Sequence, residues 1–105
     1  MYTGQKVSEW SKSVRLANHN RCIICKRKAT TAHHCVSRRL YPEYRFDWRC
    51  GVALCESCHV FIHKDEGREL REKIARNFLA AIGKYYGDQR YFKANDQRKV
   101  RTNEN

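Results

Sequence analysis

Cysteines and histidines are concentrated in the middle of this chain, at spacings that suit metal ligation. Four of the six cysteines form two Cys-x-x-Cys pairs, Cys22 with Cys25 and Cys55 with Cys58, separated by 29 residues. Together they offer four thiolates, which complete zinc's tetrahedral coordination and leave no position for water. The sequence therefore predicts a closed, structural zinc site. Disulfide bonds and a redox-active thiol pair are the alternative interpretations.

Histidines stand at two places in the same stretch. His33 and His34 are adjacent in the run AHHC, and adjacent side chains on a strand point to opposite faces. The two imidazoles are therefore expected to do different jobs. His59 and His63 are four residues apart, so on a helix they face the same way and could serve one metal ion. The alternative is that this pair only caps a helix or packs beside the zinc.

Composition and charge narrow the class of protein. The chain has 105 residues, 41% of them hydrophobic, and its 22 Lys and Arg against 11 Asp and Glu give a formal charge of +11. Such a field attracts polyanions, so nucleic acid is the expected partner, with a ribosomal or anionic membrane surface as alternatives. No secretory signal is visible, and no apolar run approaches the roughly 20 residues of a membrane span. We expect a cytoplasmic, intracellular protein whose thin core depends on bound metal.

The elements that must position these residues follow one another without a linker, in a single domain. It divides into an N-terminal helix, a metal-binding core, a C-terminal helical region and a polar tail: residues 1–19, 20–66, 67–92 and 93–105. The first helix has an apolar side that we expect to cover the metal-binding core, formed by Val7, Trp10, Val14 and Ala17.

The metal-binding core is expected to contain a β-hairpin followed by a helix. One strand includes His33 and Cys35, the return strand covers residues 48–54, and the loop between them is rich in Arg and Tyr and holds Pro42. The pattern then changes to that of a helix, which ends near His63. With helices on either side of a hairpin, the fold class is α+β.

The run GRELREKIARNFLAAIGKYYG predicts a long amphipathic helix after this core, with Gly87 as its stop. Its apolar stripe is interpreted as core rather than as a partner surface, and comprises Leu70, Ile74, Phe78, Ala81, Ile82 and Tyr85.

Taken together, the runs CIIC, AHHC and CGVALCESCHVFIH resemble the HNH endonucleases of the ββα-metal, or His-Me finger, superfamily, in the branch whose finger is braced by zinc on two Cys-x-x-Cys pairs. The resemblance covers about residues 20–66, and its specificity lies in the joint order of these elements. It implies a small ββα-metal finger, in which a β-hairpin packs on a helix around one divalent cation. It also implies hydrolysis of DNA phosphodiesters to 5′-phosphate and 3′-hydroxyl ends.

The resemblance also assigns roles to the histidines. It implies that His33 is a metal ligand and His34 the general base, and that His59 and His63 are helix ligands as in DNase colicins. Other members use acidic or asparagine ligands, so the number of protein ligands is open, and so is the choice among Mg²⁺, Mn²⁺, Ni²⁺ and Zn²⁺. A backbone carbonyl is expected to orient the second ring nitrogen of His34.

One position departs from the family's pattern. Where the family has an asparagine that ties the two strands together, this chain has Cys50, whose thiol cannot replace the two hydrogen bonds of an amide. The chain is then an active enzyme braced by strand pairing or by Asp47, a slower enzyme, or a degenerate binding module. Cys35 is interpreted as a small buried hydrophobe rather than a ligand.

Arginines near the double histidine are candidate phosphate contacts, since a guanidinium binds two phosphate oxygens at once. Arg38 and Arg39 are the first choice, with Arg45 in the hairpin loop as another. The favoured function is a metal-dependent DNA endonuclease that binds DNA largely through phosphates and could act as a homodimer. The alternative is a non-catalytic, zinc-stabilised nucleic-acid-binding module. The nearby aromatic residues are interpreted mainly as hairpin packing: Tyr41, Tyr44, Phe46 and Trp48.

Overall fold

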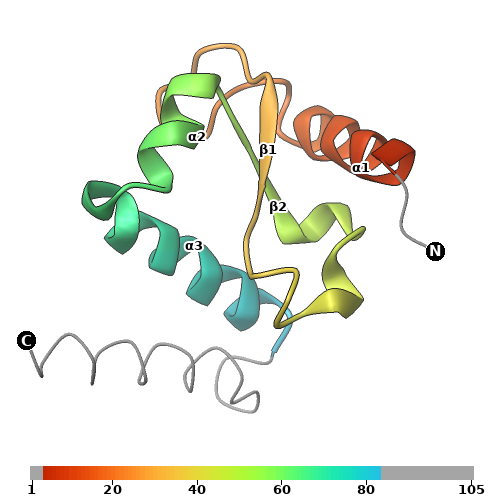
Figure 1. Ribbon diagram of the computed structural model, residues 1–105. Helices are drawn as coiled ribbons and strands as arrows, with labels where there is room; N and C mark the ends of the chain where they lie inside the picture. Colours follow the sequence, from red (N-terminus) through yellow and green to blue (C-terminus); the bar gives the residue numbers. More distant parts are fainter. Residues whose placement is uncertain (1–3, 84–105) are drawn as a thin grey trace, which may run out of the picture.

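A short antiparallel hairpin lies at the centre of the computed structural model, which describes residues 4–83 (Figure 1). Strand β1 (Thr31–His34) pairs with β2 (Gly51–Leu54), with Thr31 opposite Leu54 and His34 opposite Gly51. The predicted hairpin is confirmed, but the return strand begins later than expected. Residues Trp48–Cys50 form a 3-10 turn, η2, because the Asp47 side chain accepts a hydrogen bond from the backbone N–H of Arg49 and favours a turn over a strand.

Helix α1 (Gly4–Ala17) covers one face of the hairpin and also contacts η2 (Figure 1). Its Trp10 and Val14 side chains are buried against the sheet, as the apolar pattern predicts. Ala17, also expected on this side, is exposed, because it is the last residue of the helix. The helix lies very close to β2: a Cβ atom added to Gly51 would lie 2.5 Å from Val14 Cγ2 and 2.8 Å from Trp10 Cζ2. Glycine is therefore required at this position for α1 to pack as it does.

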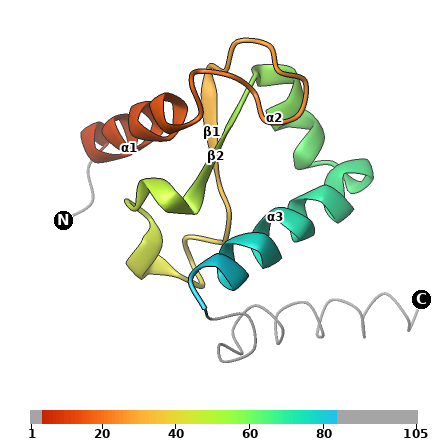
Figure 2. The same cartoon turned by 180° about the vertical axis from the view of Figure 1, so that it is seen from behind.

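Helices α2 (Glu56–Ile62) and α3 (Arg68–Ala81) lie on the other side of the hairpin, joined by the 3-10 turn η3 (Asp65–Gly67), and Figure 2 shows the same arrangement from behind. The main core forms between these helices, β2 and the hairpin loop. The whole is a small α+β fold with a two-stranded sheet and three α-helices among the described residues. The buried side chains of α3 are Ile74, Ala75, Phe78 and Leu79.

The C-terminal end of α3 differs from the prediction. Ala81, expected on the apolar stripe, is exposed and is the last helical residue. Gly83 then adopts a φ of 74°, the left-handed conformation in which many helices end. Gly83, rather than Gly87, is thus the stop signal. Tyr85, Gly87 and the polar tail over 93–105 lie outside the described residues.

The hairpin loop packs its tyrosines into the core. Tyr41 is 1% exposed, and the Tyr44 ring meets Phe78 of α3 edge to face, with centroids 5.4 Å apart. The interpretation as packing is confirmed for these two residues. Trp48 differs, because it is 53% exposed.

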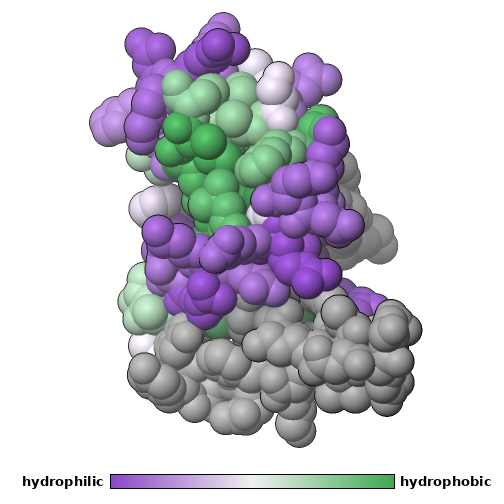
Figure 3. Space-filling model, turned by 90° about the vertical axis from the view of Figure 1, so that its left-hand side faces the viewer, coloured by the Kyte–Doolittle hydropathy of each residue, from purple (hydrophilic) through white to green (hydrophobic). Residues whose placement is uncertain are grey.

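One side of the surface is distinctly hydrophobic. Figure 3 looks onto the side where α2 lies, and hydrophobic side chains gather in its upper half, bordered by hydrophilic ones. Val60 and Phe61 of α2 are among the large hydrophobic residues that remain exposed. None of the helices within residues 4–83 combines the length and apolarity needed to cross a membrane.

Candidate metal centres and histidine cavity

The four cysteines of the two Cys-x-x-Cys pairs converge on one point. Their Sγ atoms all lie within 4.8 Å of one another, and Cys25 Sγ is 3.6 Å from Cys55 Sγ. Four sulfurs about 2.3 Å from a tetrahedral zinc would be about 3.8 Å apart, so the set fits such an ion. All six cysteines are free thiols, which favours the metal interpretation over disulfides. These four can hold a structural metal ion such as zinc.

The backbone holds the cysteines in place. Cys22 and Cys25 lie in a tight turn closed by hydrogen bonds from Cys22 N to the Arg27 carbonyl and from Lys26 N to the Cys22 carbonyl, with Lys26 at a φ of 67°. Cys55 is the N-cap residue of α2, and Cys58 follows in the first turn of that helix. A turn and a helix N-terminus thus each supply two ligands.

The ionisation of these thiols also points to a cation. Burial raises the pKa of Cys58 to about 12, and the neighbouring thiols of Cys55, Cys22 and Cys25 add to the effect. The pKa of Cys22 behaves differently: burial opposes ionisation, but hydrogen bonds from nearby backbone N–H groups lower it to about 6. Without a cation, four thiols this close together do not all ionise; as four thiolates they would need a positive ion such as Zn²⁺ to balance their charge.

Three histidines form a second cluster. The ligand nitrogens of His33, His59 and His63 all lie within 4.8 Å of one another. The His33 ring, from β1, meets the two α2 rings edge to face, with centroids 5.9 Å from His59 and 5.2 Å from His63. The strand histidine and the helix pair, which lie far apart in the sequence, are thus brought to one point.

The burial and ionisation of His33 suit a metal ligand. It is 7% exposed, and its buried Nε2 atom has no hydrogen-bond partner among residues 4–83. Burial lowers its pKa to about 3, and the nearby His63, His59, His34 and Arg71 act in the same direction. An unpaired buried nitrogen is costly, and a neutral imidazole is the form that binds metals. The donor set therefore fits a divalent cation.

His34 faces the other side of the hairpin and is held in a different way. Its ring stacks on the indole of Trp10, and its Nε2 lies 2.9 Å from the carbonyl oxygen of Arg45. Because a carbonyl only accepts, Nε2 must donate, and neutral His34 then has its lone pair on Nδ1. The carbonyl contact predicted for this residue is present. Burial lowers the pKa of His34, and the Arg38 charge acts in the same direction, while the Arg45 carbonyl opposes both.

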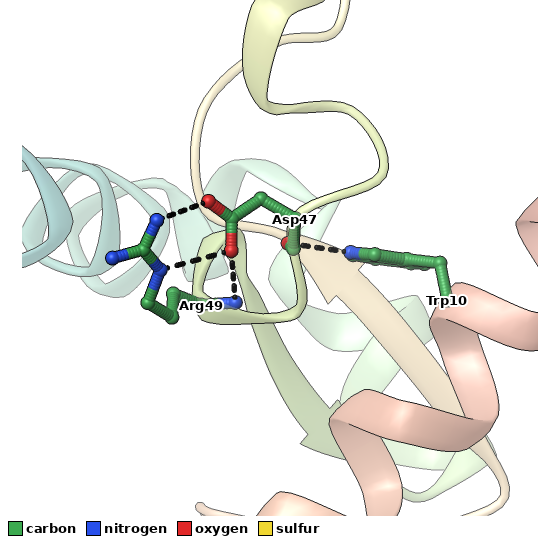
Figure 4. A network of polar contacts seen from close by, with 3 residues as sticks. All are labelled: Trp10, Asp47 and Arg49. Atoms are coloured by element: carbon green, nitrogen blue, oxygen red, sulfur yellow. Dashed lines mark hydrogen bonds and ion pairs between the residues drawn. The ribbon is translucent and has the colours of Figure 1, made fainter.

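Trp10 is itself fixed by the hairpin loop, as Figure 4 shows. Its Nε1 donates to the Asp47 carbonyl oxygen at 2.8 Å. The Asp47 carboxylate in turn accepts from the backbone N, Nε and Nη2 of Arg49, at 2.9, 3.0 and 2.7 Å. Asp47 therefore braces the site, as one interpretation of the sequence proposes, by organising the turn and holding Trp10.

The four histidines share one cavity of about 530 Å³, which Trp10, Arg38 and Arg71 also line. Arg38, which the sequence indicates as a candidate phosphate contact, thus lines the same cavity as the histidines. Arg39 does not line this cavity but a neighbouring hollow, together with Arg45. The sequence predicts that His33 and His34 point to opposite faces of the strand, and their different contacts agree with this prediction. Both residues nevertheless line the same cavity.

Trp10 and Arg71 are site residues that the sequence prediction missed. Trp10 was assigned only to packing. Arg71 donates from Nη1 to the Ile62 carbonyl at 2.6 Å, at the end of α2, and so enters the cavity. A signal existed for Arg71, because it lies three and four residues before the buried Ile74 and Ala75 and so shares their side of α3.

Cys50 connects the strands without an amide. It is 1% exposed, and its carbonyl accepts from Cys35 N at 3.2 Å. The two thiols also contact each other; this hydrogen bond, followed by burial, raises the pKa of Cys35. Cys35 is buried in the core, which confirms its prediction as a small hydrophobe. Backbone pairing thus does the bridging at this end of the hairpin.

No protein-family model matches this chain, and neither does any curated protein or solved structure at a significant level. The four histidines and their surroundings are therefore the basis on which a function can be proposed.

Proposed function

We propose that this chain is a metal-dependent DNA endonuclease of the HNH type, built on a ββα-metal finger. The observation that carries the proposal is the convergence of His33, His59 and His63 within 4.8 Å, with the oriented imidazole of His34 in the same cavity. The order β1, β2, α2 around these residues is that of a ββα finger. The cysteine cluster supports the zinc-braced form of it.

His34 is the general base of the proposed reaction. Its Nε2 is tied to the Arg45 carbonyl, so Nδ1 is the nitrogen that takes a proton from the attacking water. Stacking on Trp10 fixes the plane of the ring. A base held in one tautomer and one orientation loses no free energy to reorientation when the water attacks.

His33, His59 and His63 are the metal ligands. A divalent cation bound there supplies positive charge for the scissile phosphate and for the departing 3′ oxygen. The burial of His33 keeps its imidazole neutral and able to coordinate at physiological pH. Arg38 and Arg71, which line the same cavity, attract the phosphate electrostatically.

The second candidate is a non-catalytic, zinc-stabilised nucleic-acid-binding module. Two observations favour it: the formal charge of +11, and Cys50 at the position of the family's strand-bridging asparagine. In this alternative the basic surface binds phosphates, and the histidine cluster has only a structural role.

Cleavage of supercoiled plasmid separates the two candidates. The purified protein is incubated with Mg²⁺, Mn²⁺, Ni²⁺ or Zn²⁺ in parallel, beside the variant His34→Ala. The matched control is His19→Asn, because His19 is exposed outside the cavity and has a φ of 57°, which asparagine tolerates. We expect metal-dependent nicking that falls by about 100-fold or more in His34→Ala and persists in the control.

Other results would reject the enzyme. Binding to the plasmid without cleavage under every metal would support the binding module. Nicking that His34→Ala does not reduce would come from a contaminating nuclease or from another base.

A further inference from the structure

A second hollow adjoins the histidine cavity and is lined by Ser37, Arg38, Arg39 and Arg45. We call it the arginine hollow. Ser37 and Arg38 line both spaces, so the two lie side by side. Three arginines therefore line a space next to the cavity that holds the four histidines.

The arginine hollow has the charge of an anion site. Among residues 4–83, no acidic side chain lines it. Arg38 and Arg39 are exposed, and within residues 4–83 no carboxylate pairs with either of them. The positive charges of Arg38 and Arg39 repel each other at this distance along the chain, and a phosphate placed between them relieves this repulsion with bidentate hydrogen bonds.

The loop around the hollow has a defined backbone. The Ser37 hydroxyl accepts from the backbone N–H groups of Arg39, at 3.1 Å, and Leu40, at 3.4 Å. The Ser37 carbonyl accepts from Tyr41 N at 2.9 Å, and Tyr41 is buried in the core. The positions from which the arginines extend are thus anchored.

Arg45 joins the hollow to the base. Its backbone carbonyl accepts from Nε2 of His34, and the same residue lines the hollow, with its guanidinium over the Phe46 ring at 5.2 Å from the ring centroid. An anion bound in the hollow therefore lies next to the residue that orients the imidazole.

We propose that the arginine hollow binds a phosphate of the nucleic-acid backbone next to the one that is hydrolysed. This inference rests on the proposed function and extends it to the class of substrate: a strand that carries at least one further phosphate beside the scissile one. A small diester with a single phosphate reaches the histidines but leaves the arginine hollow unfilled.

The test compares two substrates. The catalytic efficiency, kcat/KM, is measured on a short oligonucleotide and on bis(4-nitrophenyl) phosphate, which has one phosphate only. The test variant is Arg39→Gln with Arg45→Gln. It leaves Ser37 and Arg38, the residues that also line the histidine cavity, unchanged. The control is Arg27→Gln with Arg68→Gln, two exposed arginines that line neither space. Circular dichroism and the zinc content establish that each variant is folded.

We expect the ratio of the two efficiencies, oligonucleotide over small diester, to fall by about 100-fold in the test variant and to stay within about twofold in the control. Equal losses on both substrates would overturn the inference, because the arginines would then act on the scissile phosphate or on the fold. An equal fall of this ratio in the test and control variants would also overturn the inference, because the loss would then follow from the overall positive charge rather than from the hollow.

A binding measurement keeps the inference testable if no diester is cleaved and the proposed function fails. In the His34→Ala background, the slope of log affinity for a single-stranded oligonucleotide against log salt should become shallower by about 0.7 in the test variant, because one phosphate is no longer neutralised. A slope equal to that of the control would overturn the inference. So would inorganic phosphate binding to the hollow as tightly as the oligonucleotide does, since the site would then serve a free anion.

Discussion

The imidazole of His34 lies flat on the indole of Trp10, with ring centroids 3.8 Å apart and planes only 6° from parallel. The two residues come from different elements, β1 and α1, on one face of the hairpin. The proposed base therefore depends on a helix that lies outside the β-hairpin and α2. In the proposed reaction Trp10 is a positioning residue, because it would act through the orientation of His34.

A pair of Trp10 variants can separate stacking from hydrogen bonding. Trp10→Phe and Trp10→Leu both lose the bond to the Asp47 carbonyl, which costs about 1 kcal/mol of stability, but only phenylalanine keeps an aromatic face. We expect kcat for plasmid nicking to be at least tenfold lower in Trp10→Leu than in Trp10→Phe, with similar KM. Equal kcat values in the two variants would show that stacking does not orient the base.

Asp47→Ala tests the brace beneath Trp10. Loss of the N-cap of η2 should lower the free energy of unfolding by about 1 kcal/mol, measured by urea denaturation. The hydrogen bonds from Arg49 hold the pKa of the Asp47 carboxyl below its usual range. The contribution of this carboxylate to the free energy of unfolding is therefore fully present at pH values above its unfolded-state pKa of about 3.9. It is lost only as the pH falls below that value. The difference in the free energy of unfolding between Asp47→Ala and wild type should thus be constant between about pH 5.5 and 8. A difference that shrinks within this range would contradict the prediction.

Cys50→Asn introduces the asparagine that HNH endonucleases have at this position. It distinguishes a fully active enzyme from a slower one. Because Cys50 is 1% exposed and its backbone already bridges the strands, we expect the buried amide to cost about 1–3 kcal/mol without raising the cleavage rate. Cys50→Ala, the control, should keep the activity at a smaller loss of stability. A rate increase of tenfold or more in Cys50→Asn would instead identify the native chain as the slower enzyme.

Cys25→Ser tests the structural metal. Structural zinc in small domains contributes on the order of 10 kcal/mol to folding, so we expect this variant to lose its tightly bound zinc and its cooperative thermal unfolding. Cys35→Ala, the control, removes a thiol that does not belong to the two Cys-x-x-Cys pairs. It should retain both the bound zinc and the cooperative thermal unfolding. Metal content after gel filtration and circular dichroism are the measurements. Zinc retained at the wild-type ratio in Cys25→Ser would place the ion elsewhere.

Local patterns were enough to predict the hairpin, the helices and the cysteine set, because the Cys-x-x-Cys spacing depends on short-range geometry. The i, i+4 spacing also indicated that His59 and His63 face the same way, but it was the resemblance to HNH endonucleases that implied that His33 joins them. The contact of Trp10 with His34 depends on how α1 packs across the hairpin, which no local pattern encodes. For Arg71 the local pattern indicates the inner side of α3, but its entry into the cavity depends on how α3 packs beside α2. The end of α3 was misplaced because its apolar repeat continues past Gly83, whose left-handed backbone outweighs the repeat.

Helix α2 serves both clusters. Cys55 is its N-cap, Cys58 lies in its first turn, and His59 and His63 follow on the same seven-residue helix and its C-cap. A helix this short is unstable by itself and depends on tertiary contacts, to which an ion held by the four cysteines would add a fixed first turn. A chelator that extracted only that ion would then displace His59 and His63 without binding to them, and any loss of the proposed activity would follow the loss of zinc rather than competition with substrate.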